Sequence, residues 1–136
     1  MAETKAYCWT DISVDAASWW AAALLGKTVT DILHDLPKAA RSIANQYRAI
    51  VILKSATSIV ASPEGQMVIV GKPCPGLAKG GSGDVLGMVG ACLAYYSDAF
   101  EAAVIAAAWH NDAALKCGQD IGMVAMQPYQ LLDYLE

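Results

Sequence analysis

The run AIVILK, residues 49–54, constrains the fold more than any other stretch of this sequence. It is short, rich in β-branched residues and apolar throughout, which is typical of a strand covered on both faces. It is followed by TSIVASPEGQMVIV, in which two strand-like runs flank Ser-Pro-Glu-Gly. Because proline second and glycine fourth favour a type I turn, residues 57–61 and 66–70 are predicted to pair as a β-hairpin.

Helical patterns precede this hairpin. Residues 14–26 are predicted to form a helix ended by Gly26, after a short strand within residues 5–12. Residues 30–47 carry apolar side chains at three- and four-residue spacing, and Pro37 divides them into a short helix and a second helix with the proline in its first turn.

The second half of the chain is predicted to be mostly helical. A loop rich in glycine and proline, residues 71–82, leads into an apolar helix over 84–96. A longer helix begins after Asp98 and is closed by Gly118, and a last short helix covers 129–135. Together these elements predict an α/β fold, a small mixed sheet with a β-hairpin packed by helices.

The length of the chain indicates one domain, residues 1–136. Its composition indicates that this domain associates with another chain. Apolar residues and glycine make up about 60% of the chain, against 45–50% in a typical domain. A domain of this size buries a small share of its surface, so the excess indicates that another chain covers part of it. The adjacent Trp19 and Trp20 support this, since only one of two neighbouring helical positions can point fully inward.

Charge and hydropathy argue against several classes of partner. The net charge is −4 and the nine Lys and Arg residues are scattered, so no nucleic acid partner is expected. The longest apolar runs, 85–96 and 102–109, fall short of the roughly 18–20 residues that cross a bilayer, so no membrane partner is expected. The first residues, MAETKAYCWTD, lack the pattern of a secretory signal, and a cytoplasmic location is predicted. The four cysteines contain no C-x-x-C pair, which predicts reduced thiols and no metal site.

The stretch GGSGD, residues 80–84, joins the loop to the apolar helix. Gly81 and Gly83 allow a tight turn and let an anion approach backbone amides, which the positive end of the helix dipole supports. Ser82 can cap the helix or donate a hydrogen bond, and Asp84 stands in the first turn. The junction therefore predicts a phosphate site, although an aspartate there stabilises a helix by about 0.3–1 kcal/mol without any ligand.

The order of these motifs resembles the carboxyl-terminal half of the ADP-dependent NAD(P)H-hydrate dehydratases, which are ribokinase-like. There a strand, Lys-Gly-x-x-Thr, a hairpin, a loop with Gly-[Ser/Thr]-Gly-Asp-Val-Leu and an alanine-rich helix follow one another, with a histidine late in the next helix. The chain matches this pattern from about Leu24 to about Leu135, most sharply in GGSGDVLGMVGACLA and FEAAVIAAAWH. The implied fold is ribokinase-like and truncated to about half a domain.

The resemblance implies a lyase that repairs hydrated NADH or NADPH by phosphorylating the unwanted hydroxyl with ADP or ATP and then eliminating it. Asp84 would be the general base, and Gly81, Ser82 and Gly83 would stabilise the charge that develops on the phosphoryl oxygens. The segment that would lie along the nucleotide comprises Lys54, Ser55, Ala56, Thr57 and Ser58. That segment could equally be only the end of a buried strand.

Two further expectations concern Mg²⁺ and histidine. Magnesium would arrive with the nucleotide and be held mainly by phosphates and water, since no acidic cluster is dedicated to it. His110 aligns with the family histidine, but a lone histidine on an apolar helix is more often a core residue, so no catalytic role is predicted for it.

Departures from the family pattern leave other interpretations open. ASWW at residues 17–20 replaces His-Pro-Gly-Glu, Ser55 replaces a glycine and Lys79 a small residue, and the family domain is much longer than this chain. We therefore expect the chain to assemble with itself or with a separate chain that supplies the amino-terminal half and covers an open sheet edge. The alternatives are an inactive nucleotide-binding or structural remnant, and a ribokinase-like kinase of small alcohols such as hydroxymethylpyrimidine, which shares Gly-Ser-Gly-Asp.

Overall fold

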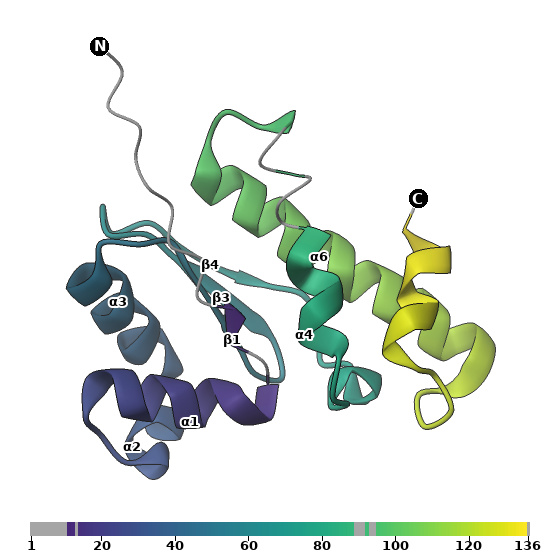
Figure 1. Cartoon of the computed structure of the whole chain (residues 1–136), viewed down its shortest axis with the longest axis horizontal. Coiled ribbons are helices and arrows are strands. Elements are labelled where there is room, and N and C mark those ends of the chain that lie inside the picture. The colour runs from purple at the N-terminus through teal and green to yellow at the C-terminus, as the bar shows by residue number, and fades with distance from the viewer. Residues whose placement is uncertain (1–10, 13, 89–91, 93–94, 136) are drawn as a thin grey trace.

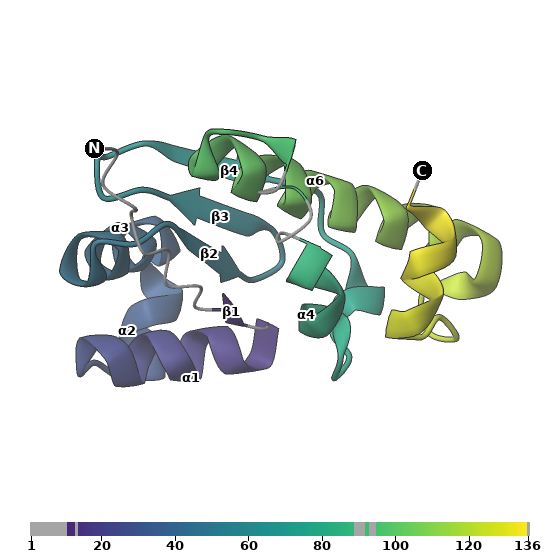
Figure 2. The same ribbon diagram turned by 45° about the horizontal axis from the view of Figure 1, so that its top comes forward.

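A computed structural model of the chain describes residues 11, 12, 14–88, 92 and 95–135. A four-stranded sheet forms the middle layer, with α1, α2 and α3 on one face and α6 on the other (Figures 1 and 2). This arrangement confirms the predicted α/β fold with helices packed on a small sheet.

The sheet is mixed, as predicted, and its strands follow the order β1-β2-β3-β4. The strands are β1 (Asp11–Ile12), β2 (Val51–Lys54), β3 (Ser58–Ala61) and β4 (Met67–Val70). The first pair is parallel and the other two are antiparallel. The hairpin pairs Ser58 with Val70 and Ala61 with Met67, and its turn closes with a 3.1 Å hydrogen bond from the Gly65 amide to the Ser62 carbonyl. The part of the first predicted strand before residue 11 lies outside the described residues.

The helices of the first half are α1 (Val14–Leu25), α2 (Val29–His34) and α3 (Leu36–Tyr47). Gly26 follows α1 with a φ of 60°, the left-handed conformation that glycine adopts without strain. Asp35 separates α2 from α3, and its carboxylate accepts a 3.0 Å hydrogen bond from the Lys38 amide, with Pro37 in the first turn. The predicted division of this segment at the proline is confirmed, and His34 is exposed.

The second half contains α4 (Ser82–Val85) and α6 (Ala99–Cys117). Around them lie the 3₁₀ turns η1 (Pro75–Leu77), η2 (Leu86–Met88) and η4 (Pro128–Tyr134) and the π-helical turn η3 (Gly118–Gly122). The predicted helix over 84–96 therefore begins as one α-turn followed by a 3₁₀ turn, in keeping with the low helix propensity of Gly83 and Gly87, and its described residues Cys92 and Tyr95 are again α-helical. Its residues 89–91, 93 and 94 lie outside the described part. The last segment was predicted as a helix and is 3₁₀ in type.

Asp98 caps α6 as predicted, since its carboxylate accepts a 2.7 Å hydrogen bond from the Glu101 amide. As predicted, α6 ends with Gly118 as its C-cap residue. Gly118 keeps a helical φ of −66°, and the chain continues through η3 to Gly122, which has a φ of 97°. A side chain at Gly118 would collide with the Met123 sulfur, 2.4 Å from the position of a Cβ, so this glycine serves close packing.

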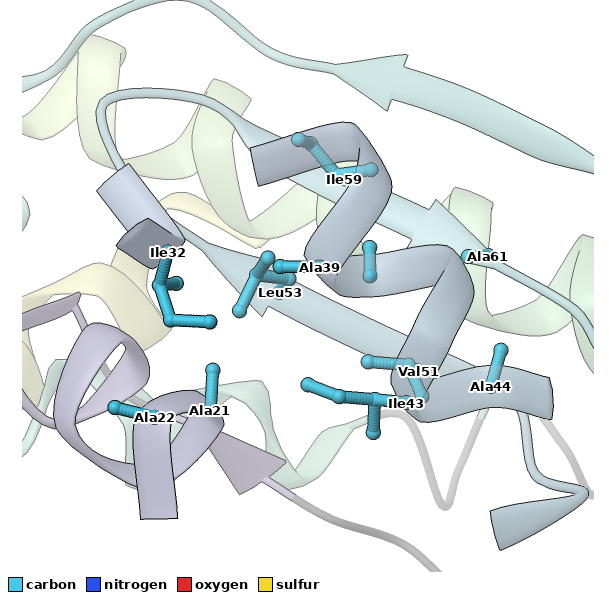
Figure 3. Close-up of a cluster of buried hydrophobic side chains, with 11 residues drawn as sticks. Ala21, Ala22, Ile32, Ala39, Ile43, Ala44, Val51, Leu53, Ile59 and Ala61 are labelled. Atoms are coloured by element: carbon cyan, nitrogen blue, oxygen red, sulfur yellow. The ribbon is translucent and has the colours of Figure 1, made fainter. Parts of the chain in front are cut away.

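Alternation along the strands divides the core between the two faces of the sheet. Val51 and Leu53 of β2 face α1, α2 and α3, where they pack with Ile32 and Ile43 (Figure 3). Ile52 faces the alanine-rich side of α6 instead. Lys54, two positions further along β2, points to the same side as Ile52 and is therefore directed toward α6.

Apolar side chains remain exposed at the margins of the sheet. Ile69 on the edge strand β4 is 61% exposed, and Trp20 on α1, the helix after edge strand β1, is 59% exposed. The burial of Trp19 lies outside what the structure describes. Cys74, Cys92 and Cys117 are buried free thiols, as predicted, and burial raises the pKa of Cys92 and Cys117. Among the described helices none is long and apolar enough to cross a bilayer.

Candidate functional site

The glycine junction is a tight turn that enters α4 at the side of the sheet. Gly81 has a φ of 95° and is the residue preceding the first helical turn, and no described side chain caps that turn. The amide and the hydroxyl of Ser82 both donate to the Lys79 carbonyl, at 3.2 and 2.8 Å, and the Asp84 amide donates to the Gly81 carbonyl at 3.1 Å. Ser82 is therefore not the cap considered in the sequence analysis, because its hydroxyl closes the preceding loop.

Two of the four predicted residues of this junction face solvent. Gly81 and Asp84 are exposed, whereas Ser82 and Gly83 are buried. The Asp84 carboxylate lies 3.9 Å from the position that a Cβ on Gly81 would take, and the Pro128 ring of η4 lies 3.6 Å from that position. The exposed carboxylate and the outer side of the turn are thus adjacent, with Pro128 beside them.

His110 connects the junction to α6. Its Nε2 lies 2.9 Å from the carbonyl oxygen of Ser82, and the side chain is 3% exposed. Burial, and then the positive charge of Lys54, lower the pKa of His110 to about 4, against a smaller opposing effect of the hydrogen bond to Ser82. The ring is neutral at pH 7, and since a carbonyl can only accept, the proton is on Nε2.

Lys54 links the same region to the sheet. It is the last residue of β2, and its side chain is 4% exposed. Its charge acts on His110, so the end of β2 and the glycine junction are coupled through that ring. In the turn that follows, the Ser55 amide donates to the Thr57 carbonyl at 2.9 Å, and Ala56 is the exposed residue. The structure therefore brings both predicted segments, 54–58 and 81–84, to the carboxyl end of β2, where ligands of α/β sheets bind.

Three residues that hold the glycine-rich loop in place were not predicted from the sequence. Asn111 exchanges two hydrogen bonds with the backbone of Lys72, at 2.9 and 2.8 Å. The Lys79 ammonium donates to the carbonyl of Val124 at 2.6 Å and to that of Met126. Pro128 packs on the junction. One signal was available for Asn111, its position next to the family histidine; the contacts of Lys79 and Pro128 depend on how the C-terminal turns fold back on the loop.

A surface cavity lies elsewhere on the described part of the chain. It has a volume of about 490 Å³ and lies along α2 and α3, where Lys27, Asp31 and Lys38 contribute to its walls. Within the described part of the chain, no group of three or more His, Cys, Asp or Glu side chains is placed to hold a metal ion.

The family model described as NAD(P)H-hydrate dehydratase matches residues 21–136, which include both segments of the site. The chain belongs to this family. The chain is similar to the bifunctional NAD(P)H-hydrate repair enzyme of Moorella thermoacetica, 35% identical over 115 residues, and to the ADP-dependent (S)-NAD(P)H-hydrate dehydratase of Neisseria meningitidis, 40% identical over 106 residues. These matches cover 84% and 77% of this chain.

Among solved structures, the fold is similar to that of the ADP/ATP-dependent NAD(P)H-hydrate dehydratase of Bacillus subtilis co-crystallised with ATP and Mg²⁺. The TM-score is 0.80 at 25% identity, over 87% of this chain. This confirms the predicted ribokinase-like half domain. The chain spans 43% of the Bacillus structure, 22% of the Moorella protein and 36% of the Neisseria protein.

Proposed function

We propose that this chain carries the phosphate-binding turn and the general base of an NAD(P)H-hydrate dehydratase. The observation that supports this is the exposed Asp84 carboxylate beside an uncapped glycine turn, coupled through His110 to Lys54 at the end of β2. Both parts lie within the region matched by the family model. Asp84, Gly81 and Gly83 keep the roles predicted from the sequence, whereas Ser82 closes the turn, because its amide and its hydroxyl both donate to the Lys79 carbonyl.

In the proposed reaction Asp84 accepts the proton of the hydroxyl group on hydrated NADH or NADPH. The hydroxyl oxygen bonds to the terminal phosphorus of ADP or ATP, and the bond from that phosphorus to the rest of the nucleotide breaks, releasing AMP or ADP. Backbone amides of the turn stabilise the negative charge on the phosphoryl oxygens. The carbon–oxygen bond then breaks, phosphate leaves, the neighbouring carbon loses a proton, and the double bond of the working cofactor is restored.

A bound nucleotide would be contacted mainly by backbone amides of the turn and less by side chains. Gly81 is exposed, and its left-handed φ turns successive amides toward one side, which is how backbone turns bind phosphate. Lys54 is buried, so we assign it a supporting positive charge beneath the site instead of a direct contact. Mg²⁺ accompanying the nucleotide would be held by phosphates and water, because the described residues offer no clustered ligands.

The test is the recovery of reduced-nicotinamide absorbance from hydrated NADH in the presence of ADP or ATP. We expect the Asp84→Asn variant to lose at least about 100-fold in rate, the usual contribution of a general base, while its stability is unchanged because Asp84 is exposed. Asp112→Asn is the matched control, since Asp112 is also exposed and forms a surface salt bridge with Lys116 on α6. Wild-type rate in Asp84→Asn would remove the proposed base.

A second candidate function is favoured by the short span of the chain relative to its relatives. Covering less than half of the matched structures, the chain would then be a nucleotide-binding or structural remnant without catalysis. Calorimetry with AMP, ADP and ATP separates the two, because nucleotide binding without turnover supports the remnant and turnover supports the enzyme. The kinase alternative has no observation of its own in the structure.

We propose that the chain is active only when it is assembled with another chain. Apolar side chains are exposed on α1, at Trp20, and on the edge strand β4, at Ile69, and an exposed strand edge favours pairing with another chain. We propose that a second copy, or a separate chain carrying the amino-terminal half, covers them. A cytoplasmic location, where reduced nicotinamide nucleotides and ADP are available, belongs to the same proposal.

A further inference from the structure

We infer that His110 is a positioning residue that orients the amide of Gly83 for phosphate binding, an inference that rests on the function proposed above. The contact that carries it is the 2.9 Å hydrogen bond from the ring to the Ser82 carbonyl. The carbonyl of Ser82 and the amide of Gly83 belong to one planar trans peptide group, so the two bonds point in opposite directions. Because His110 holds the carbonyl toward α6, the N–H of Gly83 points away from α6.

In a regular α-helix the Ser82 carbonyl would accept from the Leu86 amide, but that amide donates to the Gly83 and Asp84 carbonyls. The His110 ring donates to the Ser82 carbonyl instead. A hydrogen bond at the carbonyl also polarises the peptide group and makes its N–H a stronger donor. Gly83 is buried, and among the described residues its amide donates to no backbone carbonyl outside α4.

His110 acts on the proposed site by holding a backbone peptide group and not by contacting the substrate. The ring is buried and its described contact at the junction is a backbone oxygen, so it holds a peptide group and transfers no proton to substrate. Its neighbour Asn111 holds Lys72, at the other end of the same loop. Two consecutive residues of α6 therefore hold the two ends of the segment over residues 72–82, and each can be removed separately.

The test compares two variants at position 110. Leucine removes the donor, whereas the Nε2 of glutamine can reach the place of the ring nitrogen and donate to the same carbonyl. By hydrogen exchange at pH 7, we expect His110→Leu to speed exchange of the amides over residues 82–86 about fivefold, and His110→Gln to stay within about twofold of wild type. In calorimetry we expect the affinity for ADP to fall about fivefold in His110→Leu and to be restored by glutamine.

Two controls separate positioning from general loosening. Asn111→Leu should speed exchange near Lys72 and leave residues 82–86 protected, and His34→Gln, at an exposed histidine on α2, should change neither. Equal exchange over 82–86 in wild type and His110→Leu, or leucine and glutamine variants that behave alike, would overturn the inference. Failure of the wild type to bind ADP, with the exchange pattern as expected, would refute the proposed function and leave the positioning of the peptide supported.

If His110→Leu does not fold, the inference is tested by NMR of the wild-type protein. With ¹⁵N-labelled histidine, NMR at pH 7 should show a neutral His110 ring whose Nε2 carries a slowly exchanging proton. A ring protonated on Nδ1 alone, or a charged imidazolium at that pH, would overturn the inference because neither state matches a neutral Nε2–H donor to the Ser82 carbonyl.

Discussion

His110 Nε2 lies 2.9 Å from the Ser82 carbonyl oxygen, so a buried ring on α6 is hydrogen-bonded to the main chain of the turn that precedes Asp84. The contact joins the sheet, the long helix and the glycine junction, because Lys54 at the end of β2 acts electrostatically on the same ring. The candidate site is therefore built on rigid elements, and its exposed groups are a backbone turn and one carboxylate.

Gly81→Ala should abolish nucleotide binding at a modest cost in stability. A φ of 95° strains any residue with a Cβ, and we expect a loss of about 1–2 kcal/mol, or roughly 3–8 °C in Tm. Gly65→Ala is the matched control, because Gly65 has the same φ and an open surrounding in the hairpin turn. Thermal unfolding should show similar losses in both variants and calorimetry a loss of ADP binding only in Gly81→Ala. Equal ADP affinity in the two variants would argue against the turn.

Stability should depend on pH through His110. Its pKa is lowered from 6.5 to about 4 in the folded chain, so below pH 6.5 the unfolded chain binds the proton more readily. The contribution of the neutral ring is complete above pH 6.5 and is lost as pH falls from about 6.5 to about 4, up to about 3 kcal/mol. Urea unfolding at several pH values should show this fall in wild type and in the His34→Gln control. His110→Gln should remove it, and an unchanged profile in that variant would contradict the assignment.

Lys79 should contribute to stability through the C-terminal turn and not through the nucleotide. Its ammonium donates to the carbonyls of Val124 and Met126, and removing a charged donor from two backbone acceptors costs about 1–3 kcal/mol. We expect Lys79→Met to lower the free energy of unfolding by that amount. Lys72→Met should be neutral, because Lys72 is exposed and bonds through its backbone. Equal stability of the two variants by urea unfolding would show that the Lys79 contacts are not formed in solution.

The exposed margins of the sheet predict an assembled protein. Light scattering at micromolar concentration should give a mass above the 14.3 kDa of one chain, unless a separate partner chain is required. Trp20→Glu and Ile69→Lys should lower the mass, because both side chains are about 60% exposed at those margins. Val124→Lys is the control, since Val124 is also exposed but lies in the turn between η3 and η4. A monodisperse monomer that converts hydrated NADH would refute the need for assembly.

The sequence predicted the parts of this fold that depend on local pattern. The short apolar runs in 49–70 and the turn between them predicted β2, β3 and β4, and Pro37 predicted the break between α2 and α3. The capping residue of α6 was also correct, because an aspartate before an apolar run acts locally. The end of α6 at Gly118 was also correct, but this glycine keeps a helical φ of −66°, and the π-helical turn η3 that follows it was not predicted.

The residue types of the candidate site could be predicted from the sequence, but the hydrogen bonds that join them could not. The string GGSGD predicted a tight turn with an aspartate in the first turn of the helix, and that turn is present. The bond from His110 to Ser82 joins residues 28 positions apart, and the bonds of Lys79 join residues more than 40 positions apart. Such contacts arise only from tertiary packing, so a histidine on an apolar helix could not be distinguished from an ordinary core residue.

The most direct measurement is an NMR titration of the chain with ADP, following the backbone amides. The account predicts that the amide signals of Gly81 and Gly83 shift in a saturable way, that the Ser55–Ser58 turn shifts with them, and that Gly65 in the hairpin turn does not. Saturable shifts confined to the cavity along α2 and α3, around Lys27, Asp31 and Lys38, or no shift at concentrations that saturate known dehydratases, would contradict it.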